Sequence, residues 1–311
     1  MAERLPRAEK LPLAVRKSLR DDWEAKKEDL EKELSKVLDT PWTFSVDTNQ
    51  IWPYAQNSWA KDNLGRVIAD YFDGNIRRID EYTQKYGAEG VKELNTICHT
   101  HVMTLDVDMS GKFPYSGGDI HEGQLRLLFQ KDNFGSNANT ALEHSNIMEA
   151  LNQAEDPESK PLSFAARTSI RKQYDPQIKS VEDKIKELLG KPLALTPNWE
   201  ANFAKLKEES KKKKTELRKD WETGFGNAVL GYFQGVAYQL EWKKFEDDDM
   251  LQEGFFDAVE KAEVQLRVVD KLEKRHYNES KIEDGVLVLQ TTPHHWNSNV
   301  NDPAENIVDL L

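Results

Sequence analysis

The chain of 311 residues carries one sequence pattern twice, and this repetition limits its fold more than any other feature. Residues 120–143 (IHEGQLRLLFQKDNFGSNANTALE) align with residues 282–305 (IEDGVLVLQTTPHHWNSNVNDPAE) at a separation of 162 positions. Both stretches contain a glycine, alternating leucines, an aromatic residue and a Ser-Asn-x-Asn run in the same order. So many chemically distinct matches rarely arise by chance, and we infer an internal duplication.

The match extends toward the N-terminus. Residues 64–79 align with 225–240 at a separation of 161, and residues 18–42 align with 169–193 at a separation of 151. The difference of 161 − 151 = 10 residues is an insertion in the second copy, which KLKEESKKKK (205–214) supplies. A repeat of this length is a domain rather than a solenoid unit. We therefore expect an N-terminal arm (1–13), a first repeat (14–150), a linker (151–165) and a second repeat (166–311), with the repeats related by a pseudo-twofold axis.

Hydrophobic periodicity predicts two helices in each repeat. Apolar residues three, four and seven positions apart in 18–42 and 169–193 indicate a long amphipathic helix that ends before Pro41 or Pro192. Residues 64–79 and 225–240 carry an aromatic stripe, which is typical of a core-facing helix. Gly74 and Gly235 fall inside that second helix, where glycine is unfavourable, so they indicate close approach of another backbone.

Strands follow the second helix. Apolar residues alternate in 97–109 and 123–129 of the first copy and in 263–270 and 285–292 of the second. Alternation means one covered and one exposed face, which favours an antiparallel hairpin. TALE (140–143) and DPAE (302–305) match the capping-box pattern and predict a C-terminal helix in each copy. We expect an α+β protein whose two copies each pack long amphipathic helices on an antiparallel β-hairpin or sheet.

The Ser-Asn-x-Asn runs lie between the expected strand and the expected C-terminal helix. Asn tolerates left-handed backbone conformations, and Ser and Asn side chains can bond the local backbone. We therefore expect a structural role for both runs.

Composition limits the partners and the compartment. A net charge of −12 and a pI near 5.2 disfavour nucleic acid and anionic membranes as partners. The single cysteine, Cys98, allows no intrachain disulfide and no cysteine-built zinc site, which fits a reducing compartment. The charged N-terminal stretch has no apolar segment, and no 18 apolar residues run together. We expect a cytoplasmic protein, not bound to membranes, that is a monomer with an internal pseudo-dimer.

The string VMTLDVDMSG (102–111) is the most enzyme-like segment. It resembles the first motif of haloacid-dehalogenase-type phosphohydrolases, in which the first Asp attacks phosphorus, the second is a general acid and Mg²⁺ lies between them. The resemblance implies these roles for Asp106 and Asp108. The family usually has Gly-Thr after the second Asp, whereas Met109 and Ser110 stand here. The string also opens like a calcium loop, but its twelfth position is Gly117 rather than Glu.

Two histidines precede this string. If residues 97–109 form one strand, His99 and His101 lie on the same face and could bind one metal ion, together with Asp106 and Asp108. A third ligand is not evident, and the second copy has Glu260 and Ala262 at the two histidine positions. Strand histidines more often have a structural role.

Aromatic side chains near the chain reversals are further candidates for ligand binding. Trp is large and carries one polar group, so it serves both in cores and at binding sites. The candidates are Trp52, Trp59, Phe134, Trp296 and the neighbouring His295.

Two functions remain open at this point. The first is a non-catalytic binding or scaffold protein without a cofactor, which holds a small molecule or a protein in the groove between the repeats. The alternative is a metal-dependent, phosphohydrolase-like enzyme that uses a divalent metal at the first-repeat hairpin. Convergence of the candidate carboxylates and histidines in one concave pocket would favour the enzyme.

Overall fold

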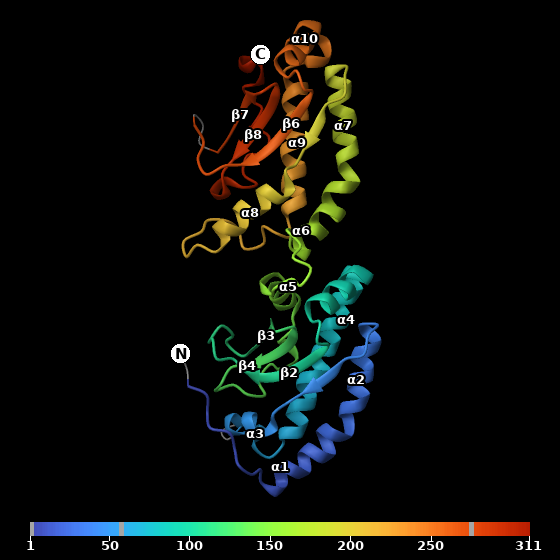
Figure 1. The fold of residues 1–311 in the computed structure, drawn as a ribbon, viewed down its shortest axis with the longest axis vertical. Coiled ribbons are helices and arrows are strands. Elements are labelled where there is room, and N and C mark those ends of the chain that lie inside the picture. The colour runs from blue at the N-terminus through green and yellow to red at the C-terminus, as the bar shows by residue number, and fades with distance from the viewer. Residues whose placement is uncertain (1–2, 56–58, 274–276) are drawn as a thin grey trace. The chain divides into compact units, whose positions relative to one another are not determined.

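The computed structural model describes residues 3–55, 59–273 and 277–311 (Figure 1). The chain divides into two compact units, Met1–Ser159 and Lys160–Leu311. Each unit combines helices with a four-stranded sheet, which confirms the expected α+β class. Among the helices described, none is long and apolar enough to cross a bilayer.

The first unit begins with a helical stretch in which a π-helical turn, Leu19–Glu24, separates α1 from α2. Short 3-10 turns connect several of the later elements. The helices are α1 (Leu13–Ser18), α2 (Ala25–Val37), α3 (Thr48–Ile51), α4 (Leu64–Ile97) and α5 (His144–Gln153), and the strands are β1 (Thr43–Ser45), β2 (Val102–Val107), β3 (Ser116–His121) and β4 (Gln124–Phe129).

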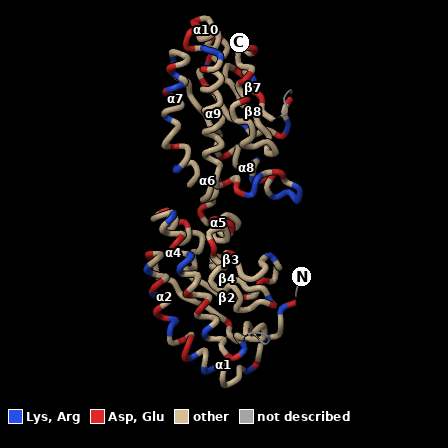
Figure 2. The backbone as a smooth tube through the Cα atoms, turned by 180° about the vertical axis from the view of Figure 1, so that it is seen from behind, with Lys and Arg blue, Asp and Glu red and all other residues tan. Residues whose placement is uncertain are grey.

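The second unit also begins with an α-helix, a π-helical turn (Ile170–Tyr174) and a longer α-helix. Its helices are α6 (Phe164–Ser169), α7 (Asp175–Leu189), α8 (Trp199–Ser210), α9 (Phe225–Trp242) and α10 (Asp249–Ala258), and its strands are β5 (Ala194–Thr196), β6 (Glu263–Val268), β7 (Asn278–Glu283) and β8 (Val286–Thr291). Segment 205–214, which the sequence predicts to be an insertion, forms the end of α8 and the basic loop that follows it (Figure 2).

The two sheets have the same strand order and the same strand directions. In the first, with order β1-β2-β4-β3, strands β1, β2 and β4 are parallel and β3 is antiparallel to β4. The second has the order β5-β6-β8-β7 with the equivalent directions. Both are mixed sheets.

The expected antiparallel pairing was therefore wrong for the two strands that the sequence indicated. β2 and β4 are parallel, with Met103 opposite Leu125, and β6 and β8 are parallel, with Val264 opposite Leu287. The hairpins are β3–β4 and β7–β8. The alternation of apolar residues shows that one face of a strand is covered, but it does not show the direction of the strand. In addition, β3 begins with a glycine-rich sequence of low strand propensity, so no strand was predicted there.

Helices α4 and α9 each run along one face of a sheet (Figure 1). The Tyr71 ring of α4 contacts Phe129 of β4 at a centroid distance of 6.4 Å. The Tyr232 hydroxyl of α9 donates a hydrogen bond of 3.3 Å to Thr291 of β8. The aromatic stripe predicted for each helix is buried, so its assignment to the core is confirmed.

Close backbone contact at the two helix glycines is also confirmed. A Cβ on Gly74 would overlap Asn139, and one on Gly235 would overlap the Val300 carbonyl oxygen. Both contacts come from the Ser-Asn-x-Asn runs at 136–139 and 298–301. Asn137 has a φ of 50° and Asn299 a φ of 47°, in the left-handed region that Asn tolerates. The runs therefore contribute to the scaffold, as the sequence indicated.

The helix ends agree only partly with the sequence-based expectation. α7 ends at Leu189, with Gly190 in the left-handed conformation at φ 70°, as a C-terminal glycine cap requires. The capping boxes were wrong. Glu143 is itself the residue before α5, and its carbonyl accepts from Ile147. Asn75 of α4 binds the Leu142 N–H, and this tertiary contact outweighs the local capping signal. In the second unit, a 3-10 turn (Ile307–Leu310) stands in place of the expected C-terminal α-helix.

Candidate functional site

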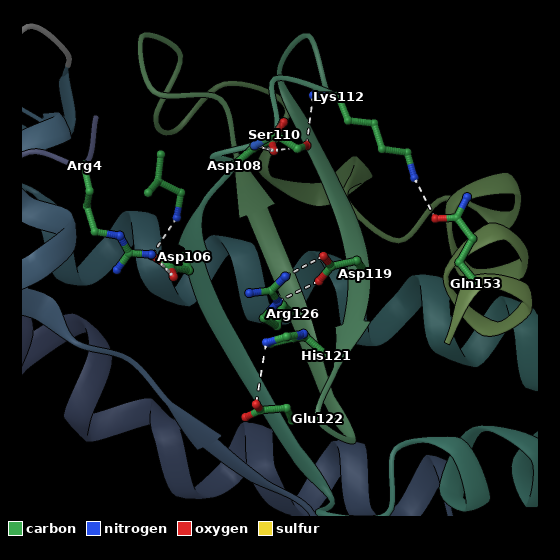
Figure 3. Close-up of polar contacts among 11 residues, drawn as sticks. Arg4, Asp106, Asp108, Ser110, Lys112, Asp119, His121, Glu122, Arg126 and Gln153 are labelled. Carbon is green, nitrogen blue, oxygen red and sulfur yellow. Dashed lines mark hydrogen bonds and ion pairs between the residues drawn. The ribbon is translucent and has the colours of Figure 1, made fainter. Parts of the chain in front are cut away.

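Asp108 follows β2 and organises the loop after it (Figure 3). Its carboxylate accepts hydrogen bonds from the Ser110 N–H at 2.8 Å, the Ser110 hydroxyl at 2.6 Å and the Phe113 N–H at 2.9 Å. Burial alone would raise the pKa of Asp108, but these hydrogen bonds outweigh it and hold the pKa below its ordinary value. The geometry is that of a loop-stabilising carboxylate.

Asp106 lies on β2, just before Asp108, and has a different partner (Figure 3). It forms an ion pair with Arg4 of the N-terminal arm. Beside it, Arg126 of β4 makes a two-pronged contact with Asp119 of β3, at 2.7 and 2.6 Å. The hydrogen bonds that Arg126 donates to Asp119 are the main cause of its raised pKa. Asp106 and Asp108 thus bond to separate partners, although the charges of both carboxylates also act on Arg126.

His99 and His101 do not lie on a strand. α4 is kinked at Gly87, where φ is 63°, and a further helical segment runs from there to Ile97, well beyond the expected helix end. Residues 98–101 therefore form the turn that leads into β2. The His99 ring lies against Gly123 in the β3–β4 turn, and the His101 ring packs near Trp42 at a centroid distance of 5.6 Å. The expected common strand face was therefore wrong. Within the described ranges, no group of three or more His, Cys, Asp or Glu residues could hold a metal ion.

Two of the aromatic candidates belong to the core. Phe134 is 2% exposed and stacks on Tyr71, and Trp296 is 7% exposed and stacks on Phe225. A ligand could reach neither ring without displacing the loop that carries it.

The other three candidates lie nearer the surface. Trp52 is partly buried and donates its indole N–H to the Lys61 carbonyl at 3.2 Å. Trp59 is 53% exposed, and the His295 ring contacts the Tyr277 ring at 4.8 Å. Within the first unit, the Trp59 ring lies near Gly135, so Trp52 and Trp59 both contact neighbouring loops.

A hollow of about 420 Å³ opens at the C-terminal end of α9 and is lined by Tyr238, Glu241, Trp242 and Lys244. Tyr238 is 48% exposed and Trp242 is 69% exposed. Their rings stand side by side, with centroids 6.5 Å apart and planes inclined by 17°. Two near-parallel aromatic faces beside a carboxylate and an ammonium group can hold a flat polar or charged group.

The surroundings of this hollow are rich in carboxylates. Glu241 forms an ion pair of 2.9 Å with Lys184 of α7. Hydrogen bonding to Glu241 is the main cause of a raised pKa for Lys184, and Glu187 and Glu246 add to it. The segment 241–249 carries five acidic and two basic residues. The hollow is therefore set in an acidic part of the second unit.

The sequence pattern of α9 draws attention to the aromatic residues of the core stripe and not to Tyr238 and Trp242. Tyr238 and Trp242 are four positions apart and so share one helix face, on the side of α9 away from that stripe. Two aromatic residues at this spacing on a solvent-facing side were the available signal.

Comparison of the chain with protein-family models, with curated proteins and with solved structures finds no match. The site must therefore be interpreted from its own geometry.

Proposed function

We propose that the chain consists of two diverged copies of one α+β unit, and that it is a non-catalytic binding protein. Equivalent contacts at equivalent positions support the duplication. Gly65 donates its N–H to the Ser18 hydroxyl at 3.1 Å, and Gly226 donates to the Ser169 hydroxyl at 2.8 Å. Each serine immediately precedes the π-helical turn of its unit.

The second contact of this kind lies beside the Ser-Asn-x-Asn runs. The Tyr71 hydroxyl accepts from the Gly135 N–H at 3.2 Å, and the Tyr232 hydroxyl accepts from the Asn297 N–H at 3.1 Å. Together with the shared strand order, these contacts support a common origin for the two units. The pseudo-twofold relation stays a prediction.

The exposed faces of the two sheets have diverged. At separations of 161 and 162, Arg267 stands in place of Asp106 and Lys281 in place of Asp119. The second unit has its own ion pairs, in which Glu283 contacts both Arg267 and Lys281. The two units share a scaffold but differ in the charges on their sheets. This difference fits a binding role better than a catalytic centre that both units inherited from a common ancestor.

The observation that carries the functional proposal is the exposed pair Tyr238 and Trp242. These rings line a hollow and face away from the core, and the corresponding positions of the first unit hold Arg77 and Glu81. Single exposed apolar residues are ordinary, but a stacked pair beside a hollow is typical of a binding surface. We propose that this hollow is the ligand-binding site.

The other expectations stay predictions. They are the groove between the units, the absence of a cofactor, the cytoplasmic location and the hydrolase alternative. No observation favours the hydrolase, because Asp106 and Asp108 each have a structural partner.

A thermal-shift screen tests the proposal. The full chain and the variants Trp242→Ala and Trp59→Ala are heated with ligands of separate classes, namely cationic peptides, sugars, nucleotides, phospholipids and divalent metals. A ligand that binds only the native state raises the midpoint. We expect one class to stabilise the wild type and Trp59→Ala but not Trp242→Ala.

Trp59 is the matched control because it is also an exposed tryptophan, at 53%, in the other unit. Shifts that all survive Trp242→Ala would refute the site. Chemical turnover of a stabilising compound by the wild-type protein would refute the non-catalytic function.

A further inference from the structure

We infer that the hollow on α9 binds a guanidinium group, presented by an arginine side chain in a flexible basic segment of a partner protein. This inference rests on the proposed function and names the ligand chemistry of the same site. It follows from the spacing of the two rings, the adjacent carboxylate and the charge of the surrounding segment.

The spacing of the rings suits a flat guest. Carbon atoms in optimal contact lie about 3.5–4.0 Å apart, so a planar group between two rings needs a separation of roughly 7–8 Å. The Tyr238 and Trp242 rings are nearly parallel, with centroids 6.5 Å apart, and both are exposed, so a flat group can stack on them after a rotation of the side chains. A tetrahedral quaternary ammonium is thicker and requires a wider opening. The guanidinium plane is both thin and cationic.

The carboxylate of Glu241 provides the second recognition element. It lies between the two aromatic positions in sequence and lines the same hollow. A carboxylate binds guanidinium through two parallel hydrogen bonds, whereas an ammonium group acts as a point charge. Glu241 now pairs with Lys184, and both side chains are substantially exposed, at 54% and 39%. Such a surface pair is weak, so an incoming guanidinium can displace the lysine.

The charge of the surroundings favours a cation over other flat ligands. The hollow itself is lined by one carboxylate, Glu241, and one ammonium group, Lys244, but the segment 241–249 has a formal charge of −3, and the whole chain carries −12. Nucleotides also stack on aromatic rings, but their phosphates would be repelled here. Arginine combines the flat shape with the sign of charge that this surface attracts.

Peptide titration followed by NMR tests the inference. The full-length ¹⁵N-labelled protein is titrated with a capped peptide that contains one arginine among glycines and serines. Two further peptides replace that arginine with citrulline, which is flat but neutral, or with lysine, which is cationic but not flat. Loss of one indole N–H signal in Trp242→Ala assigns the reporter resonance.

We expect the arginine peptide to shift the Trp242 indole signal saturably and to leave the Trp59 indole signal in place. The citrulline and lysine peptides should bind at least about fivefold more weakly than the arginine peptide. Citrulline lacks the charge for the cation–π interaction, and lysine lacks the flat group that forms two parallel hydrogen bonds with a carboxylate. Tyr238→Ala and Glu241→Gln should each weaken arginine binding by a similar factor, while Trp59→Ala should not change it. These residues are at the surface, so folding of each variant is checked by its thermal midpoint.

Three results would overturn the inference. Equal binding of the lysine and arginine peptides would mean general attraction to the acidic surface. Equal binding of the citrulline and arginine peptides would mean stacking without charge recognition. Self-association that Trp242→Ala abolishes would mean that the hollow is a contact between copies of the chain.

The guanidinium inference and the proposed function can fail separately. If the arginine peptide does not bind but another ligand class stabilises the wild type and not Trp242→Ala, only the guanidinium inference is wrong. If no ligand depends on Trp242, both are wrong.

Discussion

Replacement of Asp108 by alanine tests whether this carboxylate is structural, and the structure sets the magnitude. The change removes the acceptor for three hydrogen bonds. Ser110 is exposed, so its N–H and hydroxyl can turn to water, whereas Phe113 is buried and its N–H would lose its partner. A buried donor without a partner costs about 1–3 kcal/mol. We expect Asp108→Ala to lower the free energy of unfolding of the first unit by about 2–3 kcal/mol, because the Phe113 ring also loosens from its place against Gly117.

The pH dependence gives the second part of this prediction. The pKa of Asp108 is lower in the folded chain than in the unfolded chain. The ionised carboxylate therefore contributes fully to the free energy of unfolding above about pH 4, and this contribution is lost as pH falls through the folded pKa. The stability difference between wild type and Asp108→Ala should therefore shrink in acid. Asp108→Asn keeps one acceptor oxygen but not the charge, and it should lose less stability at pH 7.

Urea denaturation at pH 7 and in acid measures the difference, and hydrogen exchange at the Phe113 amide reports opening of the loop. Asp106→Ala is the matched control, because Asp106 is only two residues away, on β2, but pairs with the exposed Arg4. Asp106→Ala should lower the free energy of unfolding by no more than about 1 kcal/mol. A cost below about 0.5 kcal/mol for Asp108→Ala, or an equal cost at both pH values, would refute the structural assignment.

Three further predictions follow from other parts of the fold. Gly235→Ala should lower the free energy of unfolding by about 1–3 kcal/mol, because the added methyl group meets the Val300 carbonyl. The control is Gly254→Ala inside α10, where the nearest contact is 3.9 Å, and it should be neutral or stabilising. Thermal denaturation compares the two variants, and equal effects would contradict the close contact at Gly235. Cys98 is fully buried, and burial raises the pKa of its thiol, so a thiol reagent should react only as fast as the first unit opens; fast labelling in native buffer would contradict this. Burial, and then the nearby Lys85, lower the pKa of His144 below 6.5, so its NMR titration should fall below that value and stability should decrease as pH drops toward the folded pKa.

The sequence predicted the parts of the fold that repeat at a regular period. The apolar stripes located the long helices, and the paired glycines at 74 and 235 indicated the backbone contacts that the structure contains. Such features are local or are written twice, so a single chain can reveal them. The α+β class followed from the helices and strands together.

Strand direction and site assembly could not be predicted in this way. A parallel β2–β4 pair and an antiparallel pair give the same alternation when one face is covered, because side-chain direction depends on the pleat and not on the partner. His99 and His101 lie outside the strand because a further helical segment after the kink at Gly87 runs to Ile97. The amphipathic pattern that predicted the helix over 64–79 did not indicate this second segment. The partners of Asp106 and Asp108 come from the N-terminal arm and from the following loop, which no spacing rule connects to them.

The contrast between the two units bears directly on the hollow. Positions 77 and 81 of the first unit face solvent as an arginine and a glutamate, and Arg77 forms an ion pair with Asp73 on its own helix. Substitutions at such exposed positions usually change stability by less than about 0.5 kcal/mol. Folding therefore does not account for a tyrosine and a tryptophan at the corresponding positions of α9. Exposed aromatic rings also carry a solubility cost. Neither core packing nor solubility explains the pair, and this supports the proposal that Tyr238 and Trp242 recognise a ligand.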